Sequence, residues 1–362
     1  MADKDLTIKN IRLFTATKKL KKPISDATHT LTEISFVIMR IELINEVVGE
    51  SHLLSFQYSP KAIKGALKDC IEFVKGHAAY ETGLVYDKLN HLHEYFGQEG
   101  ILAWVKGAVN IAMWDAWGKS LEQPVWKMLG AYKEKIPAYG SGGWISYSIE
   151  ELLKEVTNYA NSGFKAVKIK VGSKNWKIDV ERLKKVREAI GDEVDIMMDA
   201  NQGMQLSSAI QLAKAAANLN VKWFEEPIHH DDYEGYATLR RQGGVPLAMG
   251  EREFSSKPLI ELAKRNALDI WQPDILRIGG VEPWQQSVAV AEGFHIPVMP
   301  HYYKDYDVPL LCTIPNGIAV ETFDWIDSLI DNPILIKDGY AIAHDQPGWG
   351  FRFLDECLQE IK

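Results

Sequence analysis

The sequence predicts an α/β protein, in which a (β/α)8-type TIM barrel carries an N-terminal α+β capping domain that the C-terminal segment completes. Three acidic residues, Asp199, Glu225 and Glu251, indicate the barrel because each ends a short apolar run. Both intervals between them are 26 residues long (225 − 199 and 251 − 225), which suits one strand, one crossover helix and two loops. Right-handed crossovers return each strand parallel to the last, so the three carboxylates should emerge at one end of one sheet.

The same unit repeats beyond these three strands. The expected barrel strands are Ile136–Ser141, Phe164–Val171, Val194–Asp199, Val221–Glu225, Val245–Gly250, Leu268–Gln272, Phe294–Met299 and Gly317–Glu321. Helical patterns lie between them at Ile149–Asn161, Asp179–Ile190, Ser207–Asn218, Pro258–Ala267 and Glu282–Ala291. Eight units without a break in composition favour a closed barrel over the alternative, an open doubly wound sheet. Reactive groups in such barrels lie at the carboxyl ends of the strands, where these carboxylates fall.

The segments before and after the repeat have a different pattern. The first 130 residues contain two β-like stretches and then three helical ones, namely Leu6–Thr15, Ile34–Ile44, Lys61–Lys75, Leu84–Tyr95 and Ile101–Lys119. We therefore expect a capping domain over residues 1–130 and a catalytic barrel over residues 131–331. A Gly/Pro break at residues 346–350 interrupts the C-terminal segment, 332–362, which we expect to pack back on the cap.

Composition narrows the function classes. With 362 residues and 46% hydrophobic content, the chain can bury a large core in two domains. The net charge of −8 argues against a nucleic-acid binder, and the short basic run at residues 18–22 is expected to be a solvated loop. We expect neither a signal peptide nor a membrane span, because no apolar run has the required length. Cys70, Cys312 and Cys357 are odd in number and scattered, so we expect a cytoplasmic protein.

The three strand-end acids point to a metal. Converging carboxylates repel one another unless a cation neutralises them, and a hard divalent cation prefers oxygen ligands. Asp199, Glu225 and Glu251 are therefore the candidate metal ligands at the mouth of the barrel.

Two lysines end the second expected strand. Alternation along a strand turns Lys168 and Lys170 to the same face, toward the barrel mouth. Neighbouring ammonium groups lower each other's pKa, which would make one of them a base near neutral pH. Structural salt bridges to the adjacent carboxylates are the alternative, but the nearby metal site favours catalysis.

The last three expected strands deliver Asp274 and His301, each two residues beyond its strand, and Glu321 at the end of the eighth. Asp274 and His301 come from adjacent strands, so the carboxylate should orient the imidazole and raise its basicity. Glu321 is expected to be a protonated hydrogen-bond donor in an enclosed site. A lysine, a metal and a histidine in this order suit removal of a proton alpha to a carboxylate, with the metal stabilising the ene-diolate intermediate.

These motifs resemble the enolase superfamily, in the mandelate racemase and muconate lactonizing enzyme subgroup. The similarity covers Asn110–Lys119 in the cap, Lys-x-Lys, Asp-x-Asn (Asp199, Asn201), Glu-Glu-Pro (Glu225–Pro227), Gly-Glu (Gly250, Glu251) and the Asp274/His301 pair. The resemblance implies that Asp199, Glu225 and Glu251 hold Mg²⁺. It also implies that Lys170 and His301 are the two acid/base groups. Lys168 would tune Lys170 and contact the substrate carboxylate, and Glu321 would hydrogen-bond that carboxylate from the side opposite the metal.

The resemblance is incomplete at two arginines. Arg277 replaces the lysine of many relatives, and Arg252 follows the third ligand, where it would bind substrate or else form a loop salt bridge with Glu253. The cap loops would select the substrate. The candidate substrate-binding residues are Asn201, Arg252, Asp26, His29, Leu54 and Phe56.

The overall reaction depends on the substrate, a small carboxylate. If a hydroxyl lies beta to the carboxylate, His301 can protonate it and water leaves, which describes an acid-sugar dehydratase. Without such a group the opposite base returns the proton, as in a racemase or epimerase. The polar groups Asp26, His29 and Arg252 favour the dehydratase.

Two other classes are alternatives. One is a non-catalytic barrel, and the other is a zinc hydrolase that uses the His229–Asp232 segment, which is more typical of a polar loop. We expect no nucleic-acid or membrane partner, and homo-oligomers are common among proteins that this chain resembles.

Overall fold

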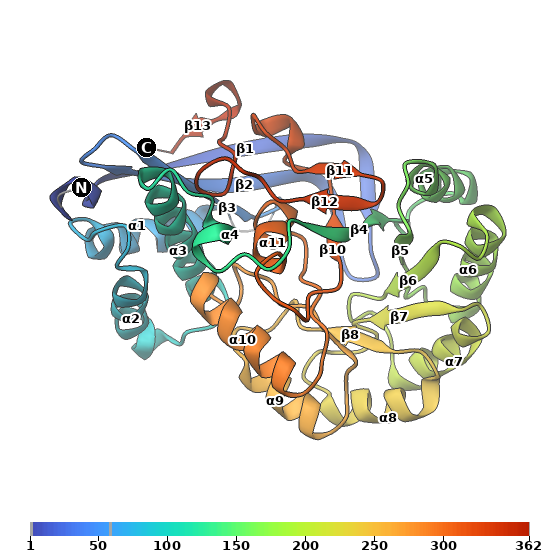
Figure 1. Cartoon of the computed structure of the whole chain (residues 1–362). Coiled ribbons are helices and arrows are strands. Elements are labelled where there is room, and N and C mark those ends of the chain that lie inside the picture. Colours follow the sequence, from blue (N-terminus) through green and yellow to red (C-terminus); the bar gives the residue numbers. More distant parts are fainter. Residues whose placement is uncertain (1–2, 58–59, 362) are drawn as a thin grey trace.

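Eight parallel segments close into a barrel in the computed structural model, which describes residues 3–57 and 60–361 (Figure 1). Six follow one another around the barrel: β4 (Lys135–Gly142), β5 (Ala166–Lys170), β6 (Asp195–Asp199), β7 (Val221–Glu225), β8 (Leu247–Met249) and β9 (Ile270–Trp271). Val298 bridges Trp271 and Gly317, and β10 (Val320–Thr322) pairs in parallel with β4, which closes the ring. The predicted closed barrel is confirmed, and the open-sheet alternative is wrong.

Helices lie outside the strands and complete the βα units (Figure 1). They are α5 (Ile149–Asn161), α6 (Trp176–Ile190), α7 (Leu206–Ala217), α8 (Tyr233–Gly243), α9 (Lys257–Lys264), α10 (Val281–Gly293) and α11 (Lys304–Leu311). Side chains cap three of these helices at their N-termini. Ser148 caps α5 in a capping box with Glu151, Asn175 caps α6, and Asp232 caps α8. The sequence pattern did not indicate α8, which is largely polar, or α11, which contains a proline. Within the described ranges, no helix has the length and apolarity needed to cross a bilayer.

The barrel interior has an apolar floor beneath a charged layer. The floor is a small buried cluster of Tyr139, Met197, Trp223, Ala248, Ile270 and Met299. Side chains two positions apart share a face of a strand, so Asp199 lies above Met197 and Glu225 above Trp223. Val167 and Ile169 instead pack outward in the main core, which turns Lys168 and Lys170 inward as predicted.

The cap combines an antiparallel sheet with helices. Its strands are β1 (Ile8–Ser25), β2 (Thr30–Leu43), β3 (Val48–Leu54) and β13 (Gln359–Glu360), in the order β13-β1-β2-β3. Its helices are α1 (Pro60–Val74), α2 (Thr82–His93), α3 (Ile101–Ser120) and α4 (Val125–Met128). Short 3-10 turns occur at Asp3–Leu6, Glu94–Phe96, Asp327–Leu329 and Asp355–Cys357.

Two cap segments differ from the prediction. Residues 48–54 form β3, a strand that was not among those expected. Nearly every residue of this strand is buried, so it lacks the polar and apolar alternation that marks a half-exposed strand. The basic run at residues 18–22 belongs to β1 rather than to a loop, because it lies on an arm that pairs with β2, but Lys19, Lys21 and Lys22 are exposed to solvent as expected. Lys22 of this arm forms an ion pair with Glu151 of the barrel.

Helix α3 connects the cap strands to the barrel and to the C-terminal segment. A Cβ at Gly49 would lie 2.2 Å from the Ala112 carbonyl oxygen, so only glycine lets β3 pack this closely on α3. Asp115 accepts hydrogen bonds from the backbone N–H groups of Glu50 and Trp349, at 2.8 and 2.9 Å. One buried carboxylate therefore joins three separate stretches of the chain.

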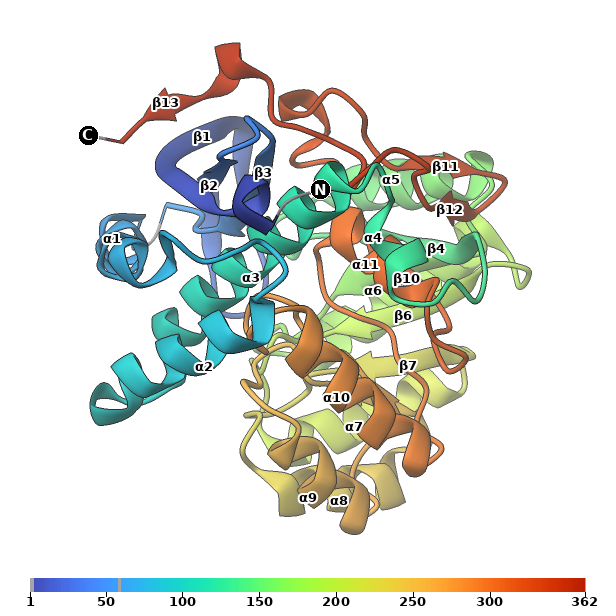
Figure 2. The ribbon, with the colours of Figure 1, turned by 60° about the vertical axis from the view of Figure 1, so that its left-hand side comes forward.

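The C-terminal segment contacts both parts of the molecule. Its hairpin, β11 (Leu335–Lys337) with β12 (Tyr340–Ile342), pairs antiparallel with the start of β4, and β13 pairs with β1 (Figure 2). We propose that the domains divide near residues 130 and 331.

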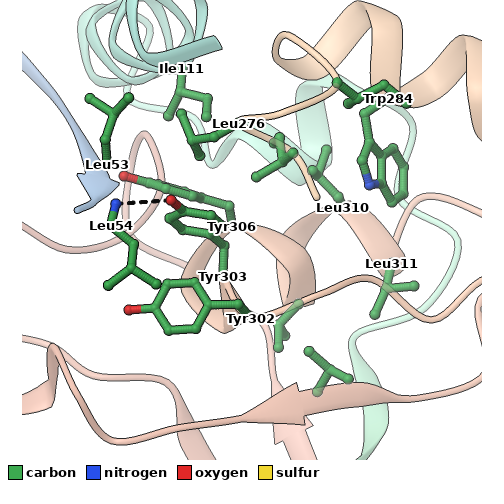
Figure 3. Close-up of a cluster of buried hydrophobic side chains, with 14 of the residues drawn as sticks. Leu53, Leu54, Ile111, Leu276, Trp284, Tyr302, Tyr303, Tyr306, Leu310 and Leu311 are labelled. Atoms are coloured by element: carbon green, nitrogen blue, oxygen red, sulfur yellow. Dashed lines mark hydrogen bonds between the residues drawn. The ribbon is translucent and has the colours of Figure 1, made fainter. Parts of the chain in front are cut away.

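The cap also hydrogen-bonds to the segment that follows His301. The Leu54 N–H donates to the Tyr303 hydroxyl at 3.0 Å, within a cluster of buried aromatic and aliphatic side chains (Figure 3). His52 contacts the Tyr306 hydroxyl through its backbone N–H, at 3.1 Å, and through Nδ1, at 2.8 Å. His52 is 1% exposed and has no room for the hydration that a charged ring requires.

Lowering the pH should reduce the free energy of unfolding, because His52 is buried in its neutral form. Burial and the nearby charge of Lys304 lower the pKa of His52 to about 3 in the folded protein, whereas an unfolded histidine titrates near ~6.5. The unfolded chain therefore binds an extra proton between these values, so the contribution is complete above pH ~6.5 and is lost progressively as the pH falls toward 3. From pH 7.5 to 5.5 the wild-type free energy of unfolding, relative to His52→Gln, should fall by about 1.4 kcal/mol in urea titrations. A difference that stays constant across this range contradicts a neutral buried His52.

Candidate active site

The predicted functional residues meet at the carboxyl ends of the barrel strands. A cavity of about 290 Å³ opens there, between the barrel mouth and the cap. Its lining includes Asp26, His29, Leu54, Phe56, Lys170, Asn201, Glu251, Arg252, Asp274, His301 and Glu321. Lys168, Asp199 and Glu225 do not line it, because they lie deeper in the charged layer and are at most 2% exposed.

The two lysines are held by carboxylates. The Lys168 ammonium lies 2.7 Å from one oxygen of Glu225 and 2.7 Å from one of Glu321, and the Lys170 ammonium lies 2.5 Å from Asp199. Burial is the largest influence on Lys170 and would lower its pKa, but the charges of Asp199, Glu321 and Glu225 together exceed burial and the repulsion from Lys168, so that pKa is raised. The prediction that mutual repulsion gives a low pKa is wrong for this set of charges.

The candidate metal ligands have oxygen donors that suit a hard divalent cation. Among the described residues, the buried Glu251 Oε2 and Asn201 Oδ1 accept no hydrogen bond, although Glu251 Oε2 faces His301 Nε2 at 3.3 Å. Burial raises the pKa of Glu225 to about 7, although Lys168 opposes the shift. In the described part of the chain no three His, Cys, Asp or Glu side chains converge closely enough to hold a metal. Asp199 and Glu225 contact the lysine ammonium groups instead. The residue types fit a divalent cation, whose binding would have to displace these ammonium contacts.

His301 is paired on both ring nitrogens. Its Nδ1 lies 3.0 Å from Asp274 Oδ2, and its Nε2 lies 3.3 Å from Glu251 Oε2. Burial would lower the pKa of His301, but Glu251 and Asp274 raise it above its ordinary value. The shift increases the share of the imidazolium form, and the ring lines the cavity, where it can donate a proton.

Glu321 has the opposite charge state from the one expected. It accepts hydrogen bonds from Ser141 Oγ at 2.7 Å and from the Tyr302 N–H at 3.0 Å. Burial favours the neutral acid, but Lys168 and His301 lower the pKa of Glu321 to about 2. The prediction of a protonated donor is wrong because these cations come from other strands.

Arg252 and Arg277 form ion pairs with carboxylates at the cavity edge. Arg252 Nε lies 2.9 Å from Glu226 Oε2 and Arg252 Nη2 lies 3.4 Å from Glu251. Glu253 instead pairs with His230, at 2.8 Å, so the predicted loop salt bridge between Arg252 and Glu253 is wrong. Arg277 donates to the Glu251 carbonyl at 2.7 Å.

The tip between β1 and β2 covers one side of the cavity. Asp26 Oδ1 accepts from the N–H groups of Thr28 and His29, both at 2.7 Å, so this carboxylate shapes its own turn. Ala27 lies so close to Gly172 and Gly203 that an added Cβ would approach its methyl to 2.8 and 2.4 Å. The tip therefore rests on the loops after β5 and β6, and small residues there permit the contact.

Sequence reasoning missed the aromatic part of the lining. Trp144, Tyr302, Phe323 and Trp325 all border the cavity. Each follows a barrel strand within a few residues, at the position where reactive groups also lie, and that placement was the available signal. The His229–Asp232 segment suggested for zinc lies outside this cavity, and His229 and Asp231 are exposed.

Two family matches cover most of the chain. Residues 8–130 match the mandelate racemase/muconate lactonizing enzyme N-terminal domain, and residues 151–357 match the enolase C-terminal domain-like family.

Relatives of the chain catalyse more than one reaction. An L-talarate/galactarate dehydratase of Salmonella typhimurium strain LT2 is 30% identical over 358 residues, which cover 96% of this chain and 89% of that protein. An L-Ala-D/L-Glu epimerase of Clostridium acetobutylicum is 26% identical over 366 residues, with coverages of 95% and 98%. A crystal structure of the Salmonella dehydratase with Mg and L-lyxarohydroxamate matches at a TM-score of 0.92 and 28% identity, covering 98% of this chain and 94% of that one. Identity at this level does not choose between dehydration and epimerisation.

Proposed function

The chain belongs to the mandelate racemase/muconate lactonizing enzyme family of the enolase superfamily, and on that premise we propose that it is an acid-sugar dehydratase. It is an enzyme of the lyase or isomerase type, like its relatives. The supporting observation is that one cavity is lined by Lys170, by His301 held at 3.0 Å from Asp274, and by Glu251. Two proton-transfer groups on separate strands can thus act on one substrate.

The proposed dehydration uses two proton transfers. Lys170 Nζ takes the proton from the carbon alpha to the substrate carboxylate. His301 Nε2, as an imidazolium, donates its proton to the hydroxyl on the beta carbon, whose bond to carbon breaks as water leaves. An enol remains, which tautomerises to a 2-oxo-3-deoxy acid. Asp274 keeps the His301 ring oriented and stabilises its charged form.

Mg²⁺ is the proposed cofactor, held by Asp199, Glu225 and Glu251. When bound, it would stabilise negative charge on the substrate carboxylate and cancel the field of Asp199 that raises the pKa of Lys170. The Mg-bound crystal structure of the Salmonella dehydratase supports this assignment. We further propose that Lys168 and Glu321 maintain the charge balance beneath the substrate carboxylate, since they pair at 2.7 Å.

Racemisation or epimerisation is the second candidate, supported by the epimerase relative. If the substrate lacks a beta hydroxyl, the proton that Lys170 removes can be replaced from His301, which inverts the carbon.

Incubation in D₂O with Mg²⁺ should separate the two reactions. We expect mass spectrometry to show loss of water from at least one sugar acid in a library of mono- and diacids. Deuterium uptake at the alpha carbon without water loss, followed by NMR, would move the assignment to a racemase or epimerase. The absence of both signals in every compound, with Lys170→Met as the blank, would contradict the proposed function.

A further inference from the structure

Side chains around the cavity differ according to the strand that carries them. Beyond the reacting groups, the loops after β6, β8 and β9 supply polar or charged side chains, namely Asn201, Arg252 and Arg277. The loops after β4, β10 and the Val298 segment supply aromatic ones. We define the aromatic wall as Trp144, Tyr302, Phe323 and Trp325 with Phe56 of the cap.

The rings of the aromatic wall touch one another around Trp325. Phe323 stacks on Trp325 with centroids 4.4 Å apart and planes 25° apart, and Trp144 stacks at 6.1 Å and 20°. Tyr302 lies 5.4 Å from the same ring, and Phe56 meets it edge-on at 5.8 Å. These contacts order the rings into one continuous apolar surface.

The cap extends this apolar surface. Leu31, Leu54, Ile63 and Ile101 line the same cavity from above, and Leu31, Leu54 and Ile63 are at most 7% exposed. A polyhydroxylated chain lying against these groups would lose water without gaining hydrogen bonds, which is unfavourable.

The cationic side chains that line the cavity already form ion pairs within the protein. Among the described residues, each lysine and arginine in its lining already contacts a carboxylate: Lys170 with Asp199, Arg252 with Glu226 and Glu251, and Arg277 with Glu251. The Arg277 guanidinium also lies over the Trp104 ring at 5.3 Å, which fixes its position. His29 Nδ1 lies 3.5 Å from Asp26. A second substrate carboxylate would have to compete with these pairs.

We propose that the substrate is a monocarboxylic sugar acid whose end remote from the carboxylate is apolar, such as a deoxy or aryl-substituted acid, and that the aromatic wall selects it. The inference rests on the proposed function and narrows its substrate class. The carboxylate and its neighbouring hydroxyls would lie on the polar side, and the remote carbons would lie against the aromatic wall.

Binding and turnover test the selection separately. The probes are a six-carbon aldarate, the aldonate and the 6-deoxyaldonate of matched configuration, and 3-phenyl-2,3-dihydroxypropanoate, all with Mg²⁺. Calorimetry on Lys170→Met, which should not turn over, is expected to show at least ~10-fold tighter binding of the 6-deoxy or phenyl acid than of the aldarate. Equal or tighter binding of the aldarate overturns the inference. If wild-type enzyme also dehydrates the aldarate, the proposed function stands; if no acid reacts, the function fails as well.

A cation placed on the wall should reverse the preference. Phe56→Arg is expected to improve aldarate binding at least ~10-fold relative to the 6-deoxyaldonate, because it supplies an uncommitted guanidinium. Phe73→Arg is the matched control, since Phe73 is 44% exposed on α1 and does not line the cavity. An effect of Phe56→Arg no larger than that of Phe73→Arg contradicts the role of the wall.

Discussion

Replacing Lys170 with methionine should lower kcat by about 10²–10⁴-fold while the protein still folds and binds Mg²⁺. Lys170 is 6% exposed, it lines the cavity, and its ammonium is 2.5 Å from Asp199. Methionine fills a similar volume but carries no base, so deprotonation of the alpha carbon should be lost. Stopped assays of water loss and of deuterium exchange measure both half-reactions.

His301→Asn should cause a loss of the same order, because no imidazolium then protonates the leaving hydroxyl. Exchange of the alpha proton catalysed by Lys170 can persist in this variant, which separates the roles of the two residues. The matched control for the lysine is Lys174→Met, since Lys174 is exposed just beyond β5. Retained turnover in both Lys170→Met and His301→Asn would falsify the two-group scheme.

The second large effect is expected at Glu251. Glu251→Gln should weaken Mg²⁺ binding by at least ~10-fold, because a charged oxygen ligand becomes a neutral one. Glu251 is 4% exposed, its Oε2 has no hydrogen-bond partner, and His301, Arg252 and Arg277 hold its pKa well below the usual range against the effect of burial. It therefore stays ionised, and a cation bound at Oε2 would replace the contact with His301 Nε2, 3.3 Å away.

Calorimetric titration of Mg²⁺ into wild type, Glu251→Gln and the surface control Glu188→Gln measures this effect. Glu188 is exposed on α6, remote in sequence from the strand ends. Treatment with a chelator should abolish water loss, and added Mg²⁺ should restore it. Equal Mg²⁺ affinities in all three proteins would remove Glu251 from the ligand set.

The aromatic wall connects these predictions to specificity. Its barrel residues follow strands on one side of the barrel mouth and are joined by Phe56 of the cap, whereas the arginines follow strands on the other side. Changes at the wall should therefore alter which acid binds, while changes at Lys170, His301 or Glu251 should alter whether any acid reacts.

The sequence by itself determined the barrel and the positions of the candidate reactive groups. The equal spacing of Asp199, Glu225 and Glu251, and the alternation at Lys168 and Lys170, are local patterns. Strand length and the two-residue period of side chains convert such patterns directly into a place at the barrel mouth. Those properties depend on neighbours along the chain, so they can be predicted without coordinates.

Only the tertiary structure decided the charge states of the site residues and the ion pairs that they form. Glu321 is ionised because Lys168 from β5 and His301 from beyond Val298 reach it, and Arg252 pairs with Glu226 rather than with the adjacent Glu253. The burial of β3 between β2 and α3 and the packing of the aromatic rings around Trp325 also depend on the tertiary structure. Electrostatic and packing energies sum over atoms brought together from distant parts of the chain, and those distances exist only after the barrel has closed.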